Sequence, residues 1–330
     1  MNLSSSSILL PALRWLLANR LQKALQLRYT VFREINPFDY PEASYLRQQD
    51  STPHQKIPLT RNRDITQISY TSAIALRVAN EWQRSPKEIA DEIYQELLNL
   101  GKTSVHNENY TSLELDLVWN YVSIQVASSG WMSFVIHPHG LAAWLHHLIH
   151  QPVRLNQFNQ GSDRPDPRTW QFGIDSASLF FVQYTHARCH SLFRLAQQEG
   201  LLKPKEPQSA DRISDWISNG LHDIEISWIG ADGHLRTHHP TEQQFISQLV
   251  HTLDEIVRLD ASLNATVGLQ LAHGLSQSFH AFYAACRICD ETRLTLPELV
   301  HARLGLIGIT QSVLRSLLID VIGTAAPTEL

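Results

Sequence analysis

The chain has 330 residues, of which 43% are hydrophobic and 18% are charged, and its formal net charge is −5 at pH 7. This length suits two domains, and the negative charge argues against indiscriminate nucleic-acid binding through clustered Lys and Arg. Only three cysteines occur, which excludes a disulfide framework and favours a reducing, cytoplasmic compartment.

Neither end of the chain predicts a membrane segment. Pro11 and Arg14 interrupt the apolar N-terminal stretch, and Arg315 and Asp320 interrupt the apolar final helix. We therefore expect neither a secretory signal nor a membrane span.

A helix start is predicted at Ser85-Pro86, with a capping Ser, Pro at the first helical position and Glu88 three residues after the cap. The segment Gly130-Trp-Met-Ser-Phe134 is similar to the strand that closes the N-terminal domain of arginyl-tRNA synthetases, and this resemblance implies a small α+β domain at the N-terminus.

A histidine cluster follows this strand. Its members are His137, His139, His146, His147 and His150. His146 and His150 have the i,i+4 spacing of two zinc ligands, but the apolar neighbours Trp144 and Leu145 favour an ordinary amphipathic helix. No metal or cofactor is predicted, and the role of the cluster stays open.

The segment Gln157–Pro167 is rich in Gln, Asn, Asp and Pro, as linkers are. The predicted organisation is an α+β domain over residues 1–150, a linker over 151–172 and a helical bundle over 173–330.

The bundle begins with a helix around Tyr184. Its polar stripe consists of Gln183, His186, His190, Arg194 and Gln197. Arg188 lies at the edge of the apolar face. It is either a packing arginine paired with a carboxylate or a ligand-binding group.

Three later apolar stripes predict helices that share a core: Ile246 to Val257, Leu271 to Cys289, and Leu306 to Val321. Between the Tyr184 helix and these three, residues 224–236 predict a hairpin with an Asp-Gly turn, which either binds a partner or is merely tolerated. Cys286 and Cys289 have Cys-x-x-Cys spacing, but no second pair accompanies them, so the zinc signal is weak.

Two motifs of the bundle resemble the DALR anticodon-binding domain of class I arginyl-tRNA synthetases. Val182 to Arg188 reproduces the family's Val-Gln-Tyr-x-His-Ala-Arg helix, and Phe279 to Arg287 reproduces its Phe-x-x-Phe-Tyr-x-x-Cys-Arg helix. The Ala302-Arg-Leu304 helix and the Ala326-Pro327 tail also match. The resemblance implies a helical anticodon-binding fold from about Ser176 onward.

A weaker resemblance covers residues 57–136. Tyr70 and the run from Pro86 to Ile93 are similar to the signature of the family's additional N-terminal domain, which is associated with the tRNA elbow. The family's Gly-Asp is replaced by Ile68-Ser69, so its RNA contacts do not carry over directly.

The family's adenylate-forming domain has no counterpart between Ile149 and Phe172, where only about two dozen residues are available. The nearest match to the His-Ile-Gly-His signature, His137-Pro-His-Gly140, lacks its last histidine. No Lys-Met-Ser-Lys-Ser loop is present. We therefore expect a protein that is not an enzyme.

The resemblance implies a non-catalytic tRNA-binding protein, with tRNA-Arg as the first candidate, that acts as an adaptor or regulator. A tRNA-modifying enzyme or arginyl-tRNA synthetase is a candidate protein partner; DNA and membranes are not expected partners. The tRNA-binding candidates are Tyr184, His186, Arg188, Arg194, Tyr283, Arg287, Arg303 and Arg315. The alternative is a protein-interaction module that has lost RNA binding, because residues 176–330 hold 16 acidic and 11 basic side chains.

Overall fold

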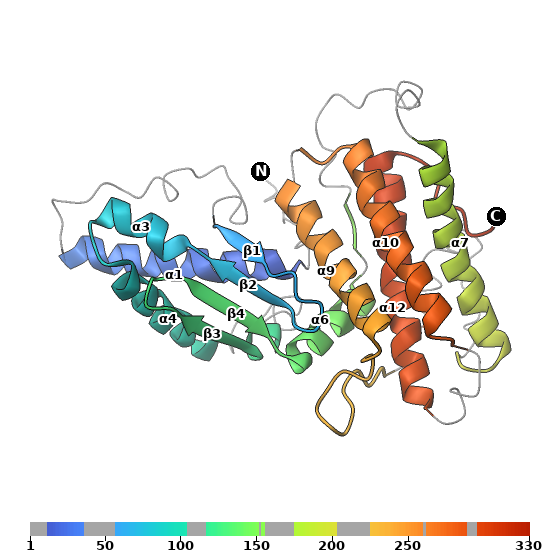
Figure 1. The fold of residues 1–330 in the computed structure, drawn as a ribbon, viewed down its shortest axis with the longest axis horizontal. Helices are drawn as coiled ribbons and strands as arrows, with labels where there is room; N and C mark the ends of the chain where they lie inside the picture. Colours follow the sequence, from blue (N-terminus) through green and yellow to red (C-terminus); the bar gives the residue numbers. More distant parts are fainter. Residues whose placement is uncertain are drawn as a thin grey trace, which may run out of the picture. The chain divides into compact units, whose positions relative to one another are not determined.

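The computed structural model describes residues 12–35, 57–103, 117–151, 153–155, 175–202, 225–259, 262–288 and 296–330 (Figure 1). The chain divides into two compact units, Ala12–Trp144 and a second unit that contains Leu145–Leu330. The division lies inside helix α6 (Pro138–His150), a few residues before the boundary that the sequence indicated.

The N-terminal unit contains a four-stranded antiparallel sheet with strand order β1-β2-β4-β3 (Figure 1). The strands are β1 (Leu59–Arg61), β2 (Ser69–Ser72), β3 (Val122–Val126) and β4 (Met132–Ile136). Tyr70 and Phe134 are paired neighbours on the buried face, and neither is exposed to solvent. Because side chains alternate along a strand, Thr71 and Ser133 lie on the opposite face.

Among its described residues this unit also contains the helices α1 (Leu13–Ile35), α3 (Ile74–Trp82) and α4 (Pro86–Thr103) and the first part of α6. Helix α4 begins at Pro86, as the sequence predicted. Arg84 and Arg28 both pair with Glu92, at 2.7 and 3.0 Å, and so tie α4 to the end of α3 and to α1. The fold expectation of a small sheet-containing N-terminal region is confirmed.

The second unit is a helical bundle (Figure 1). Its helices are α7 (Ser176–Gln198), α9 (Pro240–Leu259), α10 (Ala265–Ala285) and α12 (Pro297–Ser316), and α12 continues into the π-helix η4 (Leu317–Ile322). Helix α10 contacts α7, α9 and η4. Phe245 of α9 stacks on Phe282 of α10 at 4.9 Å, and both are fully buried. The predicted apolar stripes therefore do form one core.

Helices α12 and η4 together form one long apolar segment. Pro297–Ile322 is long and apolar enough to cross a membrane, but 67% of its most apolar window is buried inside the protein. Its hydrophobicity is accounted for by its place in the bundle core.

The expected linker begins as part of the bundle. Val153 and Leu155 are buried, at 4% and 0% exposure. The Val153 N–H donates to Ser312 Oγ (3.2 Å), Ser316 Oγ donates to the Val153 carbonyl, and the Leu155 N–H donates to Asp320 Oδ2 (2.9 Å). Three polar side chains, four residues apart along α12 and η4, thus hold the segment from Val153 to Leu155.

The expected hairpin is present in reduced form, with one bridge between Ile229 and Leu235 and a turn at Gly233, whose φ is +76°. Residue 224 lies outside the described residues. Trp228 is buried and anchors the hairpin to α12. Its ring packs so closely on Gly305 that a Cβ at that position would lie only 2.9 Å away.

Candidate nucleic-acid interface

Helix α7 presents an exposed aromatic stripe. The helix begins where the Asp175 carboxylate accepts from the N–H groups of Ala177 and Ser178, which caps the first turn. Phe180 and Tyr184, one turn apart on α7, are 59% and 42% exposed. The two exposed rings form a small aromatic patch on the surface of α7.

The Tyr184 ring stacks on His280 of α10, with 5.8 Å between ring centroids and 8° between planes. Thr185 Oγ1 donates to the Phe181 carbonyl (2.8 Å) and therefore accepts from His280 Nε2–H at 3.0 Å. Burial, and secondarily the Arg188 guanidinium, lower the pKa of His280. At neutral pH His280 is thus an uncharged ring, fixed by Thr185 and available to stack.

One turn further along α7, Arg188 contacts Tyr283 of α10. Its guanidinium donates to the Tyr283 hydroxyl (2.8 Å) and lies 5.2 Å from the centre of that ring. Arg188 is half-buried, and the Tyr283 ring lies beside its guanidinium, whereas the packing alternative called for a carboxylate. Phe180, Tyr184, Arg188, His280 and Tyr283 are called the α7–α10 surface below.

His186 and His190 lie on the other side of α7, in the interior against α12. Gln311 Nε2 donates to His186 Nε2 (3.0 Å) and to His190 Nε2 (3.3 Å), and His186 Nδ1 donates to the Pro327 carbonyl (2.7 Å). Burial lowers the pKa of His186 to about 4 and that of His190 to about 3. His186, although a candidate by motif, therefore holds the C-terminal tail and α12 onto α7.

Two further candidate arginines lie along this second side of the bundle. Arg194 pairs with Glu329 at 2.8 Å, and both side chains are well exposed. Such a surface ion pair is weak, so another anion can readily replace Glu329 beside Arg194. Arg315 of α12 is half-buried, and its charge contributes to the lowered pKa of both His186 and His190 after the larger effect of burial.

Arg303, by contrast, is an interior residue. It is 8% exposed; its Nε donates to Glu242 Oε1 (2.7 Å) and its Nη1 donates to the carbonyl of Arg287 (2.7 Å). Two nitrogens of its guanidinium, Nε and Nη1, therefore donate hydrogen bonds inside the protein. Arg287 itself is exposed, just beyond the capping residue of α10.

The structure thus divides the sequence candidates into three groups. Tyr184, Arg188 and Tyr283 come together on the α7–α10 surface, with Arg287 one turn further along the chain. Arg194 and Arg315 lie toward α12 and the tail, and His186 and Arg303 are interior. Motif matching missed Phe180 and His280; the i,i+4 spacing of Phe180 and Tyr184 was the available signal.

The histidine cluster forms no metal site in the described residues. Within the ranges that the structure covers, no three His, Cys, Asp or Glu side chains are arranged to hold a metal ion. The His150 Nδ1 instead bonds to the His146 carbonyl at 2.8 Å, an ordinary helix contact. Cys289, of the Cys-x-x-Cys pair, lies outside the described residues.

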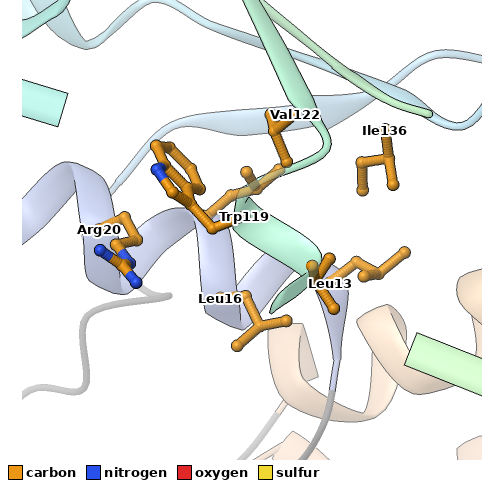
Figure 2. A pocket seen from close by; sticks show the side chains of 8 residues that line it. Leu13, Leu16, Arg20, Trp119, Val122 and Ile136 are labelled. Atoms are coloured by element: carbon orange, nitrogen blue, oxygen red, sulfur yellow. The ribbon is translucent and has the colours of Figure 1, made fainter. Parts of the chain in front are cut away.

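A small hollow lies in the N-terminal unit (Figure 2). It is lined by Leu13, Leu16, Leu17, Arg20, Val118, Trp119, Val122 and Ile136. Its one charged group, Arg20, lies 5.4 Å from the centre of the Trp119 ring and donates to the Leu100 carbonyl at 3.2 Å. The hollow therefore lacks the converging polar groups of a small-molecule site.

Comparison with known proteins shows what the bundle is similar to. Residues 182–330 match the DALR anticodon binding domain. The chain is 29% identical to the arginine–tRNA ligase of Ruminiclostridium cellulolyticum over 152 residues, which are 46% of this chain and 22% of the relative. It is 30% identical to the arginine–tRNA ligase of Heliobacterium modesticaldum over 152 residues, which are 46% of this chain and 23% of the relative. It is 25% identical to that of Chloroflexus aurantiacus over 191 residues, which are 58% of this chain and 27% of the relative.

The chain therefore spans only about a quarter of the length of these relatives. No solved structure matches it. The sequence resemblance of the C-terminal bundle to the DALR domain is confirmed.

Proposed function

We propose, from the DALR anticodon binding domain that residues 182–330 match, that this chain binds the anticodon loop of a tRNA without aminoacylating it. The first candidate is tRNA-Arg, because the curated relatives are named arginine–tRNA ligases. The protein would serve as an adaptor or regulator for a tRNA-modifying enzyme or for arginyl-tRNA synthetase.

The α7–α10 surface carries this proposal. Unpaired bases in RNA loops are bound by stacking on aromatic rings and on Arg guanidinium planes. The surface offers these groups in order along α7: the exposed rings of Phe180 and Tyr184, then Arg188, which lies over Tyr283. A loop of unstacked bases fits such a row better than a double helix does.

The charge distribution restricts where phosphates can bind. Residues 176–330 carry 16 acidic and 11 basic side chains, so the bundle as a whole repels RNA. Binding must therefore depend on a local patch, for which Arg188 and Arg287 are available at the α7–α10 surface; Arg194 and Arg315 could serve only on the side toward α12 and the tail. Phosphate contacts from so few arginines predict a modest salt dependence.

The absence of aminoacylation is part of the proposal. The segment between α6 and α7 is too short for a nucleotide-binding domain, which needs on the order of a hundred residues. In this chain Val153 and Leu155 return to the bundle almost directly after α6. The N-terminal unit, which resembles the family's additional domain around Tyr70 and Pro86, would supply a second RNA contact.

Filter binding with purified tRNA-Arg, other tRNAs and isolated anticodon stem-loops, across a salt series, tests the proposal. Saturable binding that weakens as salt rises, and that the stem-loop retains in part, is expected. Absence of saturable binding at low salt would reject tRNA binding. Robust arginine-dependent ATP–pyrophosphate exchange would reject the non-catalytic assignment.

A protein-interaction module is the second candidate. The acidic bundle favours it, as does the anchored hairpin, whose tip residues Ala231, Asp232 and His234 are exposed. Deletion of the tip residues Ala231–His234, with the anchor Trp228 retained, distinguishes the two candidates. A module that binds protein through the tip loses its partner, whereas tRNA affinity at the α7–α10 surface should not change.

A further inference from the structure

Arg287 is a cation with a fixed backbone and an exposed side chain. It follows Cys286, the residue that caps α10, so its backbone lies outside the helical hydrogen-bond ladder. Its carbonyl nevertheless accepts from Arg303 Nη1 at 2.7 Å. The Arg287 side chain is exposed, and none of the described residues forms an ion pair or a hydrogen bond with its guanidinium.

The group that fixes Arg287 is itself held rigidly. Arg303 Nε donates to Glu242 Oε1 at 2.7 Å, and Glu242 is 1% exposed. The second oxygen of Glu242 accepts from the His239 N–H at 3.0 Å, at the start of α9. One buried guanidinium therefore joins the beginning of α9, the body of α12 and the end of α10.

Only arginine supplies this geometry. Its planar fork directs two N–H groups along fixed lines, one to the Glu242 carboxylate and one to the Arg287 carbonyl, whereas the lysine ammonium is a single point charge. A buried ion pair costs desolvation, and hydrophobic packing would stabilise a bundle equally well. What hydrophobic residues could not supply is the second hydrogen bond of Arg303, which goes to the Arg287 carbonyl.

We infer that Arg303 is a positioning residue that fixes Arg287 at the end of α10, and that Arg287 contacts an RNA phosphate next to the α7–α10 surface. The inference rests on the proposed tRNA binding. Arg287 follows Tyr283 by four residues, so a base on the α7–α10 surface would place a neighbouring phosphate at this end of α10. A fixed backbone lowers the entropy lost when the long side chain is ordered on binding.

The test compares Arg287→Ala, Arg303→Lys and the double variant, with Arg258→Ala as the matched control. Arg258 is an exposed arginine of α9 that pairs with Glu255. Binding of an anticodon stem-loop RNA is measured by filter binding at several salt concentrations. Arg287→Ala should lower the slope of log affinity against log salt by about 0.7, the value for one single-strand phosphate contact.

Arg303→Lys, which keeps the charge beside Glu242, should lower the slope by a similar amount, and the double variant should bind no more weakly than Arg287→Ala. Partial unfolding of Arg303→Lys would reduce binding capacity and leave the slope unchanged. The slope therefore separates positioning from stability.

Three results overturn the inference while leaving tRNA binding intact: an unchanged slope in Arg287→Ala, an unchanged slope in Arg303→Lys, or additive losses in the double variant. Equal losses in Arg258→Ala would also overturn it, because they would indicate general charge loss. Failure of the unmodified protein to bind the stem-loop rejects the proposed function first, and this inference with it.

Discussion

Tyr184 of α7 and His280 of α10 stack with their ring centroids 5.8 Å apart and their planes 8° from parallel. They belong to different helices, and both rings are partly open to solvent. The contact supports the exposed Tyr184 ring with a ring from the neighbouring helix.

Replacement of Tyr184 by Ala should weaken stem-loop RNA binding, because stacking of one base on an aromatic side chain contributes about 1–3 kcal/mol. Tyr184→Phe retains the ring and should bind within a few-fold of the unmodified protein. Filter binding measures both, and thermal unfolding checks that the fold is retained. Equal affinity for Ala and Phe variants would exclude Tyr184 as a stacking residue.

Stability should fall as the solution is acidified below pH 6.5. The pKa values of His186 and His190 are lowered by burial from 6.5 to about 4 and about 3 in the folded protein. Between these values and 6.5 the unfolded chain binds more protons, so acid favours unfolding by up to about 1.4 kcal/mol per pH unit for each histidine. Above pH 6.5 this contribution is fully present.

Urea denaturation at a series of pH values between 4 and 7 measures this slope. The double variant His186→Gln, His190→Gln is the comparison, and its slope should be flatter whatever its stability at pH 7. An identical slope in both proteins would show that other groups control the acid response.

Gly130→Ala should destabilise the N-terminal unit. Gly130 has φ +87°, and a Cβ there would lie 2.7 Å from the Pro86 Cβ and 2.9 Å from its backbone. Because the contact is with the first residue of α4, neither backbone segment can move away without disturbing the helix. We therefore expect the free energy of unfolding to fall by about 1–3 kcal/mol. Gly200→Ala, at φ +71° with no atom within 4 Å, isolates the backbone strain. Thermal unfolding should show a clearly larger effect for Gly130.

Ser316→Ala should destabilise the bundle, because the buried carbonyl of Val153 loses its hydrogen-bond donor. A buried polar group left unsatisfied costs about 1–3 kcal/mol. Ser262, an exposed serine that donates to the Leu259 carbonyl at 2.6 Å, is the matched control, and Ser262→Ala should change little. Similar urea midpoints for the two variants would indicate that Ser316 does not hold the segment in solution.

The sequence by itself determined the helices of the bundle and their common core. Apolar spacing located α9, α10 and α12, because the 3.6-residue period of a helix turns such spacing directly into one buried face. The Ser85-Pro86 signal likewise located the start of α4, and the motif from Val182 to Arg188 indicated the resemblance to the DALR domain. All of these depend on residues close together in the chain.

Only the tertiary structure decided what the polar residues of those helices do. His186 and Arg303 belong to motifs that predicted RNA contacts. His186 is instead hydrogen-bonded to Gln311 and to the Pro327 carbonyl. Arg303 is hydrogen-bonded to Glu242 and to the Arg287 carbonyl. These partners are 125, 141, 61 and 16 residues away along the chain. Whether a polar side chain faces solvent or the core depends on which helix packs against it, and local periodicity carries no record of that.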